Sequence, residues 1–246
     1  MLGAARLLLA PVLLWQGRQV RRRALKLPEA AGARAGQAGQ GALALRLLIV
    51  GDSSGAGVGA PTQDLALAGR LAAHLAEALG GRVHWQLVAC TGHDSADARR
   101  HLAEAPLEPA DVLVTALGVN DVVGQRRASH CLQDLDAIHA MAAERCGVRY
   151  SLHSAVPPMH AFPLLPQPLR WMLGAQSQRL NRRLARHLIG RRDRGLQALP
   201  AHLHGAAAAQ HMAEDGFHPG PAGYEVWAQA LCQRLLRERR AWSPEA

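Results

Sequence analysis

The sequence predicts an α/β fold built on a parallel, doubly wound sheet. Short apolar runs alternate along the chain with longer segments whose leucines recur at helical spacing. This alternation is typical of βαβ units, in which helices cover both faces of a parallel sheet. A length of 246 residues allows one such domain with a substantial hydrophobic core.

The first half of the pattern contains the most regular elements. A strand is expected at 45–50, where an apolar run is closed by Gly51, as in a buried strand that leads into a loop. A helix is expected at 64–79, because leucines repeat near helical spacing and a glycine pair follows. The alternation continues with strands predicted at 83–89, 112–117 and 148–153 and helices at 95–102 and 131–146.

The second half begins with a proline-rich loop at 156–168, which is followed by a long helix predicted at 169–189. The fifth predicted strand, 196–203, is interrupted by Pro200, and proline cannot donate a hydrogen bond within a sheet. A final helix is expected at 221–239. The sequence therefore predicts five strands.

The positive charge of the chain is concentrated at its N-terminus. The formal net charge is +9, and seven basic residues and one acidic residue lie within the first forty positions. A nucleic-acid surface would combine basic residues with aromatic rings, but aromatic residues make up only 4% of the chain and are scattered. No nucleic-acid partner is therefore expected. We predict an N-terminal segment with a linker at 1–41 and one domain at 42–242.

Two structural roles fit the N-terminal segment. Residues 2–15, from Leu2 to Trp15, are apolar apart from Arg6, and a basic run follows them. This stretch is shorter than the about 20 residues of a transmembrane helix. Because most of the charge comes after it, secretion is disfavoured and a cytoplasmic location is expected. The segment is either a peripheral membrane anchor or a helix packed on the domain, and the glycine-rich residues 28–41 are expected to be a linker.

Four short segments lie at the ends of predicted elements. The Gly-Asp-Ser segment at 51–53, Gly92 and the Gly-Val-Asn-Asp segment at 118–121 each follow a strand, and the Asp-Gly-Phe-His segment at 215–218 precedes the last helix. The carboxyl ends of parallel strands share one edge of a sheet, where open α/β proteins bind ligands. We therefore expect the four segments to form one site.

The residue types in these segments are those of a serine esterase. Ser53 lies in a tight turn after a strand, where a hydroxyl can act as a nucleophile once a base removes its proton. His218 is the candidate base, and Asp215 is placed to orient its imidazole. The backbone N–H groups of Ser53 and Gly92 and the amide of Asn120 are the candidate oxyanion donors. No metal-ligand spacing or phosphate loop is present, so no metal is expected.

On these segments, from about residue 45 to residue 239, the chain resembles the SGNH hydrolases, also called GDSL-type esterases and lipases. The resemblance implies a flavodoxin-like three-layer α/β/α sandwich with a five-stranded parallel sheet, and it implies the nucleophile, base and oxyanion roles given above. Family members hydrolyse esters, thioesters and sugar-linked acetyl groups without a cofactor. The expected partner is therefore a small-molecule acyl ester, such as a lipid-like or short acyl ester, a lysophospholipid or a thioester. Ser54 departs from the usual leucine, which gives two adjacent hydroxyls and bears on substrate preference.

An apolar segment at 156–171 is suited to contact an acyl chain. His153 and His160, at its N-terminal end, are interpreted as surface histidines. The candidate substrate contacts are His93, Phe162, Leu165 and Trp171.

Two other functions fit the same residues. One is an acyltransferase or deacetylase that acts on a sugar or another alcohol. The other is a non-catalytic, membrane-tethered binding module. The substrate and the oligomeric state stay open at this point.

Overall fold

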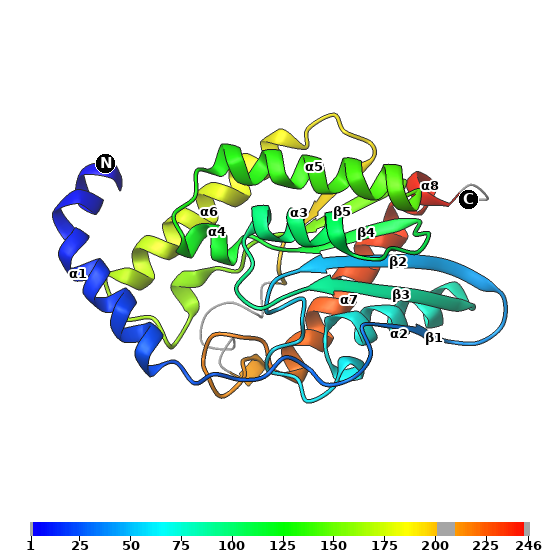
Figure 1. Ribbon diagram of the computed structural model, residues 1–246, viewed down its shortest axis with the longest axis horizontal. Coiled ribbons are helices and arrows are strands. Elements are labelled where there is room, and N and C mark those ends of the chain that lie inside the picture. Colours follow the sequence, from blue (N-terminus) through cyan, green and yellow to red (C-terminus); the bar gives the residue numbers. More distant parts are fainter. Residues whose placement is uncertain (1, 201–209, 244–246) are drawn as a thin grey trace.

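The computed structural model describes residues 2–200 and 210–243, which contain a six-stranded sheet between two layers of helices (Figure 1). The strand order across the sheet is β1-β3-β2-β4-β5-β6. Every neighbouring pair is parallel except β1 with β3, and the order β3-β2-β4-β5-β6 is that of flavodoxin-like sheets. The predicted α/β class is therefore confirmed. The strands are β1 (Ala35–Ala38), β2 (Leu43–Gly51), β3 (Arg82–Ala89), β4 (Val112–Ala116), β5 (Tyr150–Ser154) and β6 (Arg194–Gln197).

The predicted number of strands was wrong by one. Strand β1 lies within residues 28–41, which the sequence indicated as a linker, and it pairs antiparallel with β3. Its sequence, Ala-Gly-Gln-Ala, lacks the alternation and the β-branched residues that predict a strand. A contact distant in sequence favours it instead: a Cβ at Gly36 would lie 2.9 Å from the Trp85 ring, so only glycine lets β1 approach β3 there.

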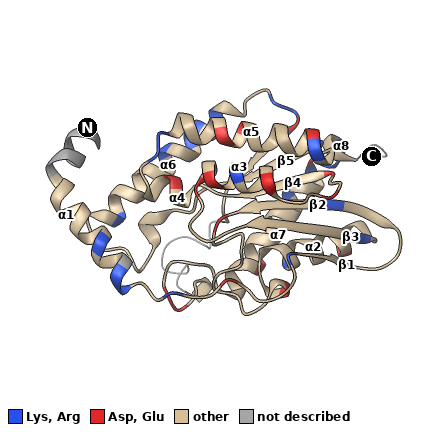
Figure 2. Cartoon of the chain, in the orientation of Figure 1, with Lys and Arg blue, Asp and Glu red and all other residues tan. Residues whose placement is uncertain are grey.

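Helix α1 (Leu2–Arg23) extends from the domain and carries basic residues in the half nearest to β1 (Figure 2). It packs on the start of α6 (Leu169–His187) through Leu13, which is buried, and Gln16. The Gln16 side chain donates to the Gln167 carbonyl at 2.6 Å and accepts from the Leu169 N–H at 3.1 Å. Within the described residues, no helix has the length and apolarity needed to cross a bilayer.

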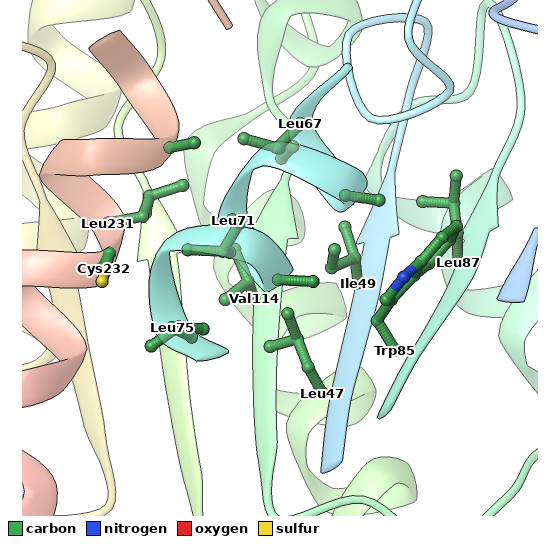
Figure 3. Packing of buried hydrophobic residues seen from close by; sticks show 14 of the residues in the cluster. Leu47, Ile49, Leu67, Leu71, Leu75, Trp85, Leu87, Val114, Leu231 and Cys232 are labelled. Carbon is green, nitrogen blue, oxygen red and sulfur yellow. The ribbon is translucent and has the colours of Figure 1, made fainter. Parts of the chain in front are cut away.

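Side chains of the central strands alternate between two cores. Leu47 and Ile49 point to the core under α2 (Leu67–Leu79) and α7 (Pro221–Arg237), where the leucines of α2 pack on them (Figure 3). Leu48 and Val50 point to the opposite core. This two-residue period fixes the register of the sheet, because a shift by one residue would exchange the cores. The opposite core is covered by α3 (Ser95–Glu104), α5 (Ala128–Cys146) and α6.

The remaining elements are short. Residues 196–203 were predicted as a strand, but β6 begins earlier and ends at Gln197, before Pro200, and residues 201–203 lie outside the described part of the chain. A helical turn after β4 was not predicted. The short elements are η1 (Gln63–Leu65), α4 (Val119–Val123), η2 (Met159–Ala161) and α8 (Arg239–Trp242).

Candidate active site

Three loops that follow neighbouring strands meet at one edge of the sheet. Gly51, at the end of β2, is in register with Ala89 of β3 and with Ala116 of β4. The predicted nucleophile and both predicted oxyanion segments begin within four residues of these positions. The sheet therefore brings segments that are far apart in sequence to the same place.

The loop that carries Ser53 is compact because glycines allow close backbone contacts. At Gly59, φ is +96°, and a Cβ would lie 2.3 Å from the Pro219 carbonyl oxygen, so another residue would push the two loops apart. The Tyr224 hydroxyl also holds this loop by donating to the Val58 carbonyl at 2.7 Å. These contacts bring the Ser53 loop against the segment that ends at His218.

The structure brings Ser53, His218 and Asp215 into a continuous hydrogen-bonded chain. Nε2 of His218 lies 2.9 Å from Oγ of Ser53, and Nδ1 lies 2.6 Å from Oδ2 of Asp215. An ionised carboxylate can only accept, so Nδ1 carries the proton in this pair. Nε2 is then the acceptor for the Ser53 hydroxyl.

Asp215 is held in its ionised state by several donors. Its side chain is only 3% exposed, and burial alone would raise its pKa. The His218 imidazole and the backbone N–H groups of His218 and Phe217 donate to the carboxylate, and these bonds hold its pKa below the ordinary value. The negative charge is therefore stable beside the imidazole.

The second hydroxyl of the motif has a different partner. Ser54 donates from Oγ at 2.7 Å and from its backbone N–H at 2.9 Å to Oδ1 of Asp52. Asp52 is fully buried, and burial raises its pKa despite these bonds. The geometry therefore places Ser53 beside the histidine, whereas Ser54 shapes the turn.

Gly92 and Asn120 lie on two adjoining loops. Gly92 adopts φ of +87°, and within the described part of the chain its N–H has no hydrogen-bond acceptor. Nδ2 of Asn120 donates to the His93 carbonyl at 2.9 Å, which ties the two loops together. The Asn120 amide carries a second hydrogen that this bond does not use.

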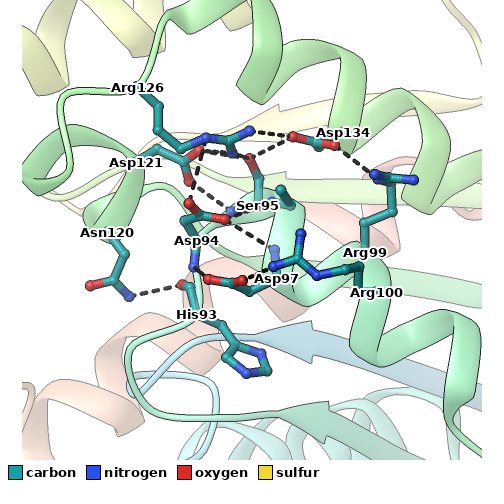
Figure 4. A network of polar contacts seen from close by, with 11 residues as sticks. His93, Asp94, Ser95, Asp97, Arg99, Arg100, Asn120, Asp121, Arg126 and Asp134 are labelled. Atoms are coloured by element: carbon teal, nitrogen blue, oxygen red, sulfur yellow. Dashed lines mark hydrogen bonds and ion pairs between the residues drawn. The ribbon is translucent and has the colours of Figure 1, made fainter.

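A buried polar network fixes these two loops to each other (Figure 4). Asp121 accepts from the backbone N–H and the hydroxyl of Ser95, at the start of α3. Arg126 donates at 2.7 Å to both Asp121 and Ser95 and at 2.9 Å to Asp134 of α5. The carboxylates around Arg126 raise its pKa despite partial burial. Arg126 thus binds both Asp121, which follows Asn120, and Ser95, three residues after Gly92.

An apolar cavity opens beside Ser53 and His218. Of the four candidate substrate contacts, Phe162 lines it, and His93, Leu165 and Trp171 lie outside its described lining. Leu165 is buried in the core against α6 because the loop turns there, while Trp171 is 46% exposed on the first turn of α6. His93 instead meets His101 edge to face at 5.3 Å.

Several lining residues were missed by the sequence interpretation. Phe217 lies between the two predicted catalytic positions and contacts Phe162 edge to face at 5.1 Å, and Trp227 reaches the cavity from α7. Trp227 lies in the predicted last helix, and no role was assigned to it from the sequence. His153 was interpreted as a surface residue, but it is 1% exposed and lies 2.8 Å from the Thr115 hydroxyl. Among the described residues, no group of three metal-ligating side chains is placed to hold an ion.

Solved structures share this fold. The lipase from a goat rumen metagenome has a TM-score of 0.60 at 19% identity, and the match covers 76% of this chain and 95% of that one. The crystal structure of TesA has a TM-score of 0.56 at 22% identity, covering 78% and 99% of the two chains. The esterase EstA from a Pseudoalteromonas species has a TM-score of 0.54 at 15% identity, covering 79% and 98%.

The amino-acid sequence also matches the model of a known protein family. The model of the GDSL-like lipase and acylhydrolase family matches residues 49–226, from β2 into α7. None of the curated proteins matches the sequence. Because the family model covers most of the chain, the protein belongs to the GDSL-like lipase/acylhydrolase family of esterase- and lipase-type hydrolases.

Proposed function

We propose that the protein is a serine esterase that hydrolyses carboxylic esters with apolar acyl groups through an acyl-serine intermediate. One observation carries this proposal. Ser53, His218 and Asp215 form a chain of hydrogen bonds of 2.9 and 2.6 Å, in the order that serine activation requires. Membership of a lipase and acylhydrolase family supports the same chemistry.

In the first step, His218 Nε2 accepts the proton of Ser53 as Oγ bonds to the ester carbonyl carbon. The carbonyl π electrons move to its oxygen, and the resulting oxyanion is stabilised by the N–H groups of Ser53 and Gly92 and by Asn120. Asp215 stabilises the imidazolium electrostatically without taking its proton. The intermediate then expels the alkoxide, which leaves as the alcohol with the proton from His218.

In the second step, His218 removes a proton from water as the water oxygen bonds to the acyl carbon. The bond to Ser53 Oγ then breaks, His218 returns the proton to Oγ, and the carboxylic acid is released. Both half-reactions use the same three side chains. The catalytic group is therefore regenerated without a cofactor in this proposal.

The cavity walls support an apolar acyl group as the substrate portion nearest Ser53. Leu117, Val119, Phe162 and Phe217 contribute to the lining together with Trp227. Burial of each methylene group contributes roughly 0.8 kcal/mol to binding. We therefore expect kcat/KM to rise with acyl length until the cavity is filled.

The test is hydrolysis of a series of p-nitrophenyl acyl esters by the wild-type protein and by Ser53→Ala. The variant is expected to lose roughly a millionfold in kcat. Ser129→Ala, at an exposed serine, is the matched control and is expected to keep the wild-type rate. Wild-type rates in Ser53→Ala would refute the proposal. If an added alcohol became the main acyl acceptor, the protein would be an acyltransferase instead.

A further inference from the structure

Helix α1 presents apolar side chains that the fold leaves uncovered. Leu13 and Gln16 face the domain, where Leu13 is buried and Gln16 is bonded to the start of α6. On the rest of the helix surface, Val12, Leu14 and Trp15 are 43%, 61% and 60% exposed. These three large apolar side chains lie within four positions on the uncovered surface of the helix, and we call them the exposed patch. Val12 and Trp15, three residues apart, share one face, and clustered exposed apolar side chains are typical of interaction sites.

Basic side chains continue this patch along the helix. Arg18 and Arg22 are exposed and lie three and seven residues after Trp15, so the three side chains share one face. Residues 1–28 contain six basic residues and no acidic residue. A second copy of this helix would therefore be repelled, whereas an anionic surface would be attracted. The charge of the patch favours an anionic partner.

The exposed tryptophans of the chain lie where α1 meets α6. Of the five tryptophans, Trp85, Trp227 and Trp242 are buried, whereas Trp15 and Trp171 are exposed by 60% and 46%. Trp171 lies two residues after Leu169, whose N–H binds Gln16 of α1. Tryptophan is enriched at the interface between lipid and water, because its ring is apolar and its N–H is polar.

The same joint is continuous with the wall of the cavity. Phe162 lines the cavity, and five residues later Gln167 accepts the hydrogen bond from α1. In Figure 1, α1 lies on the side of the molecule toward which the carboxyl ends of β2 and β3 point. Helix α1 and the candidate active site therefore lie toward the same end of the sheet.

From these observations we infer that α1 docks the protein on an anionic lipid bilayer and brings the cavity close to ester lipids in that bilayer. The apolar side chains of residues 12–15 enter the interface, and the arginines that follow bind lipid phosphates. The inferred docking depends only on the exposed side chains of α1. The delivery of an ester lipid to Ser53 rests on the proposed function.

The test is cosedimentation of the full chain with phosphatidylcholine vesicles that do or do not contain phosphatidylglycerol. To separate docking from catalysis, binding is measured in the Ser53→Ala background as well. Each arginine neutralised near an anionic surface is expected to weaken binding about fivefold, so Arg18→Gln/Arg22→Gln loses about thirtyfold. Leu14→Gln/Trp15→Gln is expected to weaken binding tenfold or more, because two apolar side chains no longer enter the lipid.

Matched controls change exposed arginine and apolar residues outside α1. Arg239→Gln/Arg240→Gln on α8 removes two exposed arginines, and Ile189→Gln removes a side chain that is 78% exposed. Both controls are expected to bind anionic vesicles like the wild-type protein. Thermal unfolding of each variant shows whether it is folded, and added salt should release the wild-type protein from the vesicles.

Three results would overturn the inference: equal binding to neutral and anionic vesicles, no binding, or loss of binding only in the α8 control. A salt-resistant dimer that Leu14→Gln/Trp15→Gln dissociates would assign the patch to a second copy and also overturn it. If binding follows the α1 variants but no ester is hydrolysed, the proposed function fails and docking stands. If soluble esters are hydrolysed without vesicle binding, docking alone fails.

Discussion

Two groups of polar side chains border the candidate active site, and their charges are compensated differently. In the first group, hydrogen bonds join Asp215 to His218 and His218 to Ser53, so that one carboxylate binds one imidazole. In the second group, Arg126 is shared by Asp121 and Asp134. The first group can exchange a proton between Ser53 and His218, because Nε2 of the imidazole accepts from the hydroxyl while Nδ1 keeps its proton and donates to Asp215. The second group contains no imidazole, and its charges are locked, because Arg126 is held in ion pairs with Asp121 and Asp134.

This difference indicates a division of labour at one edge of the sheet. A group that changes protonation during a reaction needs few competing partners, so that its hydrogen bonds can exchange. A group that aims donors at an oxyanion works best when it does not move, because its reorganisation would add to the barrier. The locked charges beside Gly92 and Asn120 meet this requirement for donors that do not move.

Among changes that leave Ser53 in place, the largest effect is expected from breaking the first group at Asp215. Asp215→Asn can donate to Nδ1 of His218, which favours the wrong tautomer, so kcat is expected to fall roughly ten-thousandfold with the fold intact. Steady-state kinetics on a soluble ester measures this loss. Asp193→Asn makes the same change at a carboxylate beside His139 that is 46% exposed, and its rate should stay at the wild-type level. A rate above one tenth of wild type in Asp215→Asn would contradict the triad.

A smaller effect is expected from removing Asn120, one of the proposed oxyanion donors. Asn120→Ala loses the side-chain amide, and kcat is expected to fall about 10²- to 10³-fold while KM changes little. The exposed Gln229→Ala serves as the matched loss of an amide. If KM rose and kcat did not change, Asn120 would contribute to substrate binding and not to the transition state.

The locked charges provide the next test. Arg126→Met leaves Asp121, with only 1% of its side chain exposed, without its cation, so the free energy of unfolding is expected to fall by about 3–5 kcal/mol. Because the loops then loosen, kcat is expected to fall about tenfold as well.

A double-mutant cycle shows whether this rate effect passes through Asn120. In the Asn120→Ala background, Arg126→Met should cause little further loss of kcat. Arg127→Met, at the exposed neighbouring arginine, is the control for both stability and rate. Full additivity of the two rate effects would show that Arg126 does not position Asn120.

The smallest expected effect is on the slope of stability against pH, and it concerns His153, a buried residue near this edge. Burial, with Arg194 nearby, lowers its pKa to about 3. Between pH 3 and about 6.5 the unfolded chain binds a proton at this position and the folded chain does not. The free energy of unfolding therefore falls by about 1.4 kcal/mol for each unit by which the pH is lowered through this range. Chemical unfolding of His153→Gln across this range should show a shallower slope. The exposed His130→Gln should keep the wild-type slope, and equal slopes for wild type and His153→Gln would contradict the burial argument.

The sequence predicted the parts of the fold that local patterns encode. Apolar runs predicted the central strands, and Gly51 closed the run at 45–50. Glycine at the ends of α2 and α5 adopts the left-handed conformation that stops a helix. Strand β1 was missed because its short sequence has no strand pattern, and the reason for its Gly36, the Trp85 ring on β3, is distant in sequence. His153 was misplaced because its burial depends on its register with Thr115 across two strands.

The candidate site divides in the same way. Ser53, Asp215 and His218 were named from motifs, and the structure brings them together. The cavity walls could not be read from motifs, because they come from side chains on separate elements that meet only in the folded chain. Phe162 was named and lines the cavity, whereas Phe217 and Trp227 were missed. The role of Arg126 depends on the spatial meeting of α3, α4 and α5, which no local pattern records.

The central claim is that Ser53 is an activated nucleophile, and covalent labelling tests it most directly. The intact protein is treated with a fluorophosphonate probe, and the adduct is located by mass spectrometry of peptides. We expect one adduct on Ser53 in the wild-type protein and in Ser54→Ala, and none in Ser53→Ala. An adduct on Ser54, or no adduct on folded wild-type protein, would contradict the account.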